Sequence, residues 1–162
     1  MRGALRFAPL LLLLGAAPAP SAPLPDIDMI RVRKAARVME LYADGRLVRV
    51  VEHIQLGDEP VGAKHFEGEE RTPEGRYAID WGNPDSAYHL SLHISYPDAA
   101  DRAYAAERGR LPGGMVMIHG QPNGYGGRVT GDWTDGCIAV SDDEIEALWQ
   151  AVADGTPIEI LP

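Results

Sequence analysis

Cysteine and basic residues are scarce in this sequence of 162 residues. Cys137 is the only cysteine, which excludes a disulfide within the chain and a zinc site built from several thiolates. The 15 lysines and arginines are outnumbered by 24 aspartates and glutamates, and the formal net charge is −9. A domain this acidic is repelled by phosphate backbones. We therefore predict no nucleic-acid partner.

A hydrophobic run long enough to cross a bilayer, about 20 residues, is also missing. The apolar stretch from Phe7 to Ala17 is shorter, follows Arg2 and Arg6, and is succeeded by small residues up to Ala22. This order is typical of a secretory signal peptide, although an uncleaved N-terminal anchor has the same features. We predict a signal peptide at residues 1–22, export to the periplasm or cell envelope, and no integral membrane domain.

Most of the remaining patterning predicts β-strands. Two runs rich in β-branched residues flank Asp44-Gly45, a dipeptide typical of a hairpin turn. Apolar and polar residues alternate strictly from His89 to Ser95, as in a half-buried strand. Further short strands are expected at 76–80, 114–118, 137–140 and 157–161. Because strands do not alternate with helices and no repeat is present, we predict a mainly β fold: an antiparallel β sandwich or flattened barrel with one or two short helices.

Two segments carry helix signals. Asp98 can cap a helix over Asp98–Arg108. Ser141 and Glu144 have the spacing of a capping box, and Gly155 can end the helix that they begin. Apolar residues recur at helical spacing after this box, at Ile145, Leu148, Trp149 and Val152. The second helix is therefore the most strongly indicated element of the chain.

Two short motifs carry the residues suited to covalent chemistry. His119-Gly120 follows one apolar strand, and Thr134-Asp135-Gly136-Cys137 precedes another, with five glycines in the loop from Gly120 to Gly131. A free thiol has a pKa of about 8.5, so Cys137 needs a neighbouring base such as His119 to act as a nucleophile. The N–H groups of Gly136 and Cys137 are candidate donors to an oxyanion. This set of groups suits acyl transfer through a thioester.

The sequence and order of these motifs resemble those of the catalytic domain of the L,D-transpeptidases (YkuD-type). The family has His-Gly, an interval of this length, and then Ser/Thr-x-Gly-Cys; 71–77 is similar to its Thr-Pro-x-Gly-x-Tyr turn and 155–160 to its closing strand. The resemblance covers residues 35–162, after a predicted linker at 23–34. It implies that Cys137 is the nucleophile, that His119 transfers protons, and that the Gly120 carbonyl orients the imidazole.

The same resemblance implies peptidoglycan stem peptides as partners, both as acyl donor and as amine acceptor, with release of D-alanine and no cofactor. Two positions depart from the family pattern: Asp135 stands where many members have a second histidine, and Ala139 where many have arginine or asparagine. The acceptor of the acyl group is therefore either an amine or water. An amine acceptor defines an L,D-transpeptidase, and water defines a carboxypeptidase or endopeptidase. A non-catalytic wall-binding module is the alternative from another class.

Further residues, one on the strand at 89–95 and the others in the second motif or in the segment that precedes it, are predicted to contact substrate. They are His93, Tyr125, Arg128, Trp133, Thr134 and Asp135. Ordinary structural roles compete with this prediction, because His93 suits a strand surface, Arg128 a solvated loop, and Tyr125 and Trp133 simple packing. We predict no metal site, because His89 and His93 lie on a strand, where the spacing does not bring them together as ligands.

Overall fold

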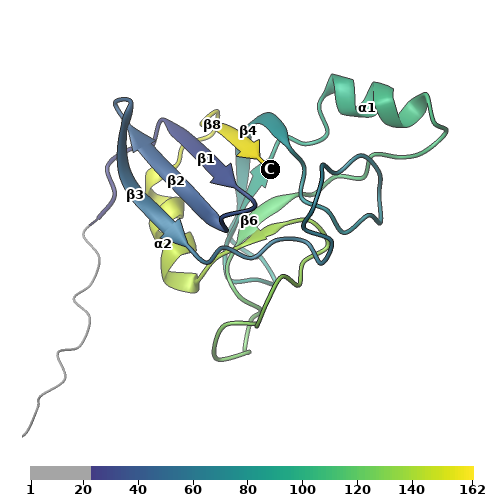
Figure 1. The fold of residues 1–162 in the computed structure, drawn as a ribbon. Coiled ribbons are helices and arrows are strands. Elements are labelled where there is room, and N and C mark those ends of the chain that lie inside the picture. Colours follow the sequence, from purple (N-terminus) through teal and green to yellow (C-terminus); the bar gives the residue numbers. More distant parts are fainter. Residues whose placement is uncertain (1–22) are drawn as a thin grey trace, which may run out of the picture.

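The computed structural model describes residues 23–162, so the predicted signal peptide lies outside the described residues. This range forms eight strands and two helices (Figure 1). The strands are β1 (Met29–Arg33), β2 (Val38–Ala43), β3 (Arg46–Glu52), β4 (Gly75–Asn83), β5 (Ser91–Ile94), β6 (Met117–His119), β7 (Ile138–Ala139) and β8 (Pro157–Leu161); the helices are α1 (Ala99–Ala106) and α2 (Asp142–Ala151). The prediction of a mainly β fold with two short helices is confirmed.

The eight strands form one curled sheet in the order β3-β2-β1-β8-β4-β5-β6-β7. Five neighbouring pairs are antiparallel, while β1 with β8 and β6 with β7 run parallel. The last strand of the chain therefore lies in the middle of the sheet. It joins the half that contains β1 to β3 to the half that contains β4 to β7.

The first strand differs from the linker expected at 23–34. Met29–Arg33 pairs with β2 on one side and with β8 on the other, and Ile30 and Val32 are fully buried. This segment alternates apolar and basic residues, as a strand with one core face does, so the domain begins before residue 35. The predicted hairpin is present between β2 and β3, where Asp44 and Gly45 both have positive φ, of 51° and 68°.

Both predicted helices are present and begin at their expected caps. Asp98 accepts a hydrogen bond from the N–H of Asp101, and the Asp101 carboxylate accepts one in return. Ser141 likewise caps α2, but the Glu144 carboxylate lies 3.4 Å from Arg49 of β3. Glu144 therefore ties the start of α2 to the sheet.

A single hydrophobic core lies between the sheet and α2, and α1 stands apart from it at one side (Figure 1). Its fully buried members come from nearly every element, among them Ile30, Leu41, Ile79, Ile94, Ile118, Ile138, Ile145 and Leu148. This packing holds the short strands β6 and β7, which have few hydrogen bonds of their own. No helix within residues 23–162 is long and apolar enough to cross a membrane.

Candidate active site

The parallel pairing of β6 with β7 brings the two sequence motifs together. Ile118 lies opposite Ile138, and both side chains are buried in the core. Because side chains alternate along a strand, His119 and Cys137, each one residue away, turn to the other face. Both line one cavity of about 450 Å³. The structure thus places the predicted base and nucleophile in the same site.

His119 is held in a defined orientation at the end of β6. Its side chain is 3% exposed, and Nδ1 lies 2.7 Å from the carbonyl oxygen of Gly120. A carbonyl only accepts, so Nδ1 carries the proton and Nε2 keeps its lone pair. Burial lowers the pKa of His119, and the hydrogen bond to Gly120 acts in the opposite direction. The imidazole is therefore neutral and can accept a proton at Nε2.

Two aromatic rings enclose this imidazole. The ring of Tyr88 lies 4.6 Å from that of His119, and the ring of Trp133 lies 5.6 Å away in an edge-on arrangement. The two aromatic rings also contact each other, at 5.7 Å. Together they cover part of the imidazole and contribute to its burial.

The Cys137 thiol hydrogen-bonds with the backbone of β6 and its approach, rather than with His119. Its sulfur accepts from the N–H of Met117 at 3.3 Å, and the thiol lies 3.6 Å from the carbonyl oxygen of Met115 as a donor. Burial raises the pKa of Cys137, with smaller opposing effects from Met117 N–H and Lys64. The structure therefore holds a neutral thiol beside a neutral imidazole, and the proton must move when substrate arrives.

Thr134 stabilises the turn that carries Cys137. Its hydroxyl donates to the Cys137 carbonyl at 2.7 Å and accepts from the Gly136 N–H at 3.2 Å. The Gly136 N–H is thus already used within the turn, which differs from its expected role as an oxyanion donor. The N–H of Cys137 itself is the remaining candidate.

Gly136 is required by its surroundings as well as by its backbone. Its φ is 121°, a region that residues with a Cβ rarely adopt. A Cβ at this position would lie 2.5 Å from the carbonyl oxygen of Arg71. The segment around Arg71 therefore packs directly on the turn that carries the cysteine.

The structure separates the other predicted site residues into two groups. Trp133, Thr134 and Asp135 line the cavity together with His119 and Cys137. Three further predicted residues lie elsewhere: His93, Tyr125 and Arg128.

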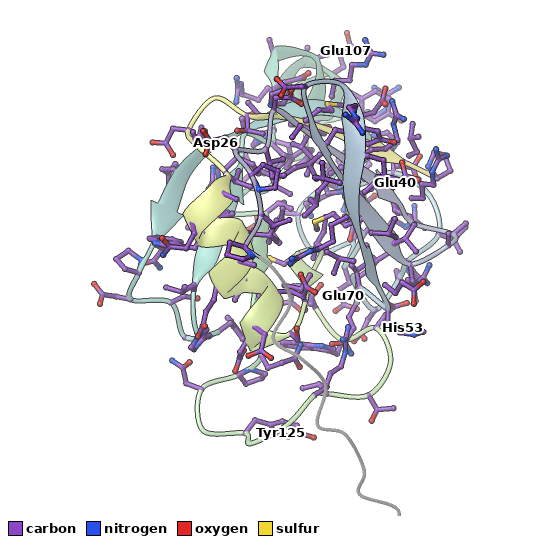
Figure 2. The ribbon with its side chains drawn as sticks, turned by 90° about the vertical axis from the view of Figure 1, so that its left-hand side faces the viewer. Asp26, Glu40, His53, Glu70, Glu107 and Tyr125 are labelled. Carbon is purple, nitrogen blue, oxygen red and sulfur yellow. The ribbon has the colours of Figure 1, made fainter. Side chains whose placement is uncertain are left out.

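Two of these three make local contacts, and the third is exposed to solvent. The His93 imidazole stacks on Trp81, and its Nδ1 lies 2.6 Å from Asp80. Tyr125 is 57% exposed on the loop that projects from the body of the domain (Figure 2). Arg128 donates to the carbonyl of His53 and lines a different cavity. None of the three lines the cavity that contains His119 and Cys137.

Sequence patterns gave no indication of several residues that complete the cavity. Tyr88 comes from the loop between β4 and β5, while Met115 and Val116 come from the approach to β6. Their roles arise from contacts between segments distant in the chain. Within residues 23–162 no group of three or more histidine, cysteine, aspartate or glutamate side chains is arranged to hold a metal ion.

Comparison with known proteins places this site in a family. Residues 27–160 match the family model of YkuD, the L,D-transpeptidase catalytic domain. The YafK protein of Escherichia coli K12, whose name describes it provisionally as an L,D-transpeptidase, is 29% identical over 133 residues. The match covers 76% of this chain and 46% of YafK, so this chain spans about half the length of that relative.

Solved structures agree with the same architecture. The helical cell shape determining protein Pgp2 of Campylobacter jejuni superposes with a TM-score of 0.67 and 26% identity, over 86% of this chain and 49% of Pgp2. An L,D-transpeptidase of Xylanimonas cellulosilytica shares the fold, with a TM-score of 0.54 and 17% identity over 88% of this chain and 64% of its own. Both motifs that meet in the cavity fall inside the matched residues 27–160. The chain thus belongs to the YkuD family of L,D-transpeptidase catalytic domains.

Proposed function

We propose that this protein is an exported L,D-transpeptidase that acts on peptidoglycan stem peptides through a thioester on Cys137. The observation that carries the proposal is the shared cavity of His119 and Cys137, in which Nε2 of the imidazole is free to accept a proton. Membership of the family supports this reaction class. The apolar N-terminal stretch with its preceding arginines supports export to the compartment that holds the substrate.

In the proposed reaction, Cys137 attacks the carbonyl that joins the third residue of the stem to the terminal D-alanine. His119 takes the thiol proton as the C–S bond forms and gives it to the leaving amine as the C–N bond breaks. D-Alanine departs and the thioester remains. The N–H of Cys137 is the backbone donor placed to stabilise the oxyanion. Substrate entry also has to release the thiol from Met115.

We favour transfer of the acyl group to an amine over transfer to water. Tyr88 and Trp133 enclose His119 and restrict the access of water on that side. The net charge of −9 also attracts an acceptor that carries an ammonium group. Tyr125, by contrast, projects into solvent and does not close the cavity. The second candidate is therefore a hydrolase of the same fold, with L,D-carboxypeptidase activity.

The test uses a tetrapeptide muropeptide with and without an excess of a D-amino acid. We expect release of D-alanine, an adduct on Cys137 detected in the mass of the intact protein, and mainly exchanged product. Because Cys137 is the only cysteine, the adduct can be assigned without mapping. Cys137→Ala should abolish both signals and leave the circular dichroism spectrum unchanged, because the thiol packs at the edge of a cavity.

Three other results point to different functions. Tripeptide as the sole product at every amine concentration would identify a carboxypeptidase. Neither D-alanine release nor an adduct would favour a wall-binding module. An adduct that persists in Cys137→Ala would rule out the nucleophile.

A further inference from the structure

Lys64 lies beside the active site and has no role in the reaction as described. It is only 5% exposed, and its ammonium group donates one hydrogen bond, of 3.0 Å, to the carbonyl of Phe66. Within residues 23–162 it forms no ion pair, although Glu69 and Glu67 act on it at longer range. Burial of a cation without a paired carboxylate costs free energy. A group of this kind that lines a cavity is a candidate for binding a charged ligand.

The cavity that Lys64 lines adjoins the active site. It has a volume of about 380 Å³ and is bounded by Lys64, Glu67, Glu70 and Asp135. It shares Gly114 and Asp135 with the cavity that contains Cys137. The electrostatic effect of Lys64 also reaches the thiol, because it lowers the pKa of Cys137 while Asp135 raises it. A ligand held here therefore has one end near the reacting sulfur.

In this second cavity the positive charge is buried and the negative charges are exposed. Lys64 is buried, whereas Glu67, Glu70 and Asp135 are exposed. A simple anion would be repelled by the three carboxylates, and a simple amine would leave the ammonium of Lys64 unpaired. A ligand with a carboxylate directed towards Lys64 and an ammonium group at Asp135 would be complementary to both the buried ammonium and the exposed carboxylates. That combination is the end group of a free amino acid.

We propose that Lys64 is a specificity-determining residue, which selects as acyl acceptor an amine that carries a neighbouring free carboxylate. This inference rests on the proposed function, because it concerns the step after the thioester has formed. The acceptor ammonium loses one proton to solvent, and its nitrogen attacks the thioester carbonyl. A C–N bond forms, the C–S bond breaks, and the second proton passes through His119 to the sulfur of Cys137.

The experiment compares D-methionine with D-methioninamide, which keeps the amine but lacks the carboxylate. The ratio of transfer product to hydrolysis product is measured for each acceptor in the wild type and in Lys64→Met. This ratio depends only on events after acylation, so a change in thioester formation does not affect it. Each acceptor is compared between proteins, so the different basicities of the two amines cancel.

We expect Lys64→Met to lower transfer to D-methionine about tenfold, which corresponds to the loss of about one charge-assisted contact, and to change transfer to D-methioninamide less than twofold. An equal effect on both acceptors, or no effect on either, would overturn the proposal. So would a wild type that forms the thioester and transfers it to neither amine. Failure to form the thioester at all would instead overturn the proposed function.

A second variant keeps the proposal testable if Lys64→Met does not fold. Asp135→Asn changes an exposed side chain at the junction of the two cavities. Both acceptors carry the ammonium group that Asp135 is inferred to hold. We therefore expect the transfer ratio to fall for both, and an unchanged ratio for both would contradict the inferred orientation of the ligand.

Discussion

His119 is buried beside the rings of Tyr88 and Trp133, and burial disfavours the protonated imidazole. The pKa of His119 lies below its ordinary value of about 6.5, so the imidazole stays neutral to a lower pH than a solvated histidine. Below that pKa the imidazole is protonated and accepts no proton from the thiol. The acidic limb of the profile of kcat/KM against pH should therefore lie below pH 6.5.

Removal of the Tyr88 ring should move this limb. In Tyr88→Ala the imidazole gains water on the side that the ring covers, and its pKa rises towards the ordinary value. We expect the acidic limb to shift to higher pH by about half a unit, measured by kcat/KM and by NMR titration of His119. Tyr88→Phe keeps the ring contact at 4.6 Å and is the matched control, for which we expect no shift. A profile that is unmoved in Tyr88→Ala would show that the ring does not set the histidine pKa.

At the scale of the element, the turn that carries Cys137 depends on its contact with the segment around Arg71. A Cβ on Gly136 would meet the Arg71 carbonyl at 2.5 Å, and the φ of 121° adds strain. We expect Gly136→Ala to lower the free energy of unfolding by about 2–4 kcal/mol and to lower kcat, because the turn has to shift. Chemical denaturation and steady-state kinetics measure the two effects.

Gly127 provides the control for this substitution. It lies in the glycine-rich loop, its φ is not positive, and a Cβ there would meet nothing within 4 Å. Gly127→Ala should leave the free energy of unfolding within about 0.5 kcal/mol of the wild type. Equal losses in the two variants would contradict the role of the Arg71 contact.

The elements differ in how far the sequence predicts them. The two helices and the β2–β3 hairpin follow from local signals, namely the caps Asp98 and Ser141 and the turn Asp44-Gly45. The prediction of a linker at β1 is wrong, because its five-residue alternation is a short signal and one of its two partners, β8, lies more than 120 residues away. Within the site, His119 and Cys137 follow from their motifs. Tyr88 and Lys64 do not, because long-range packing alone brings them there.

At the scale of the whole molecule, β8 is the connection between the two halves of the sheet. Ile160 is 1% exposed and faces Val32 on β1 and Gly75 on β4. We expect Ile160→Ala to lower the free energy of unfolding by about 2–4 kcal/mol. Because the halves meet at this strand, amide hydrogen exchange should accelerate equally in β2 and in β6.

Leu47 on β3 is the comparison site for this prediction. It is a similar apolar side chain but is 51% exposed, so Leu47→Ala should cost less than about 1 kcal/mol. Faster exchange confined to one half of the sheet in Ile160→Ala would show that the halves are stable separately.

The central position of β8 also determines when the domain can fold during synthesis. Ribosomes produce β8 after every other strand of this sheet, so β1 has no parallel partner and β4 lacks one neighbour until residues 157–161 emerge. A nascent chain that has not reached this point cannot close its sheet. A chain in which β8 is not yet available therefore stays open enough to pass through a narrow secretion channel, as the proposed export would require.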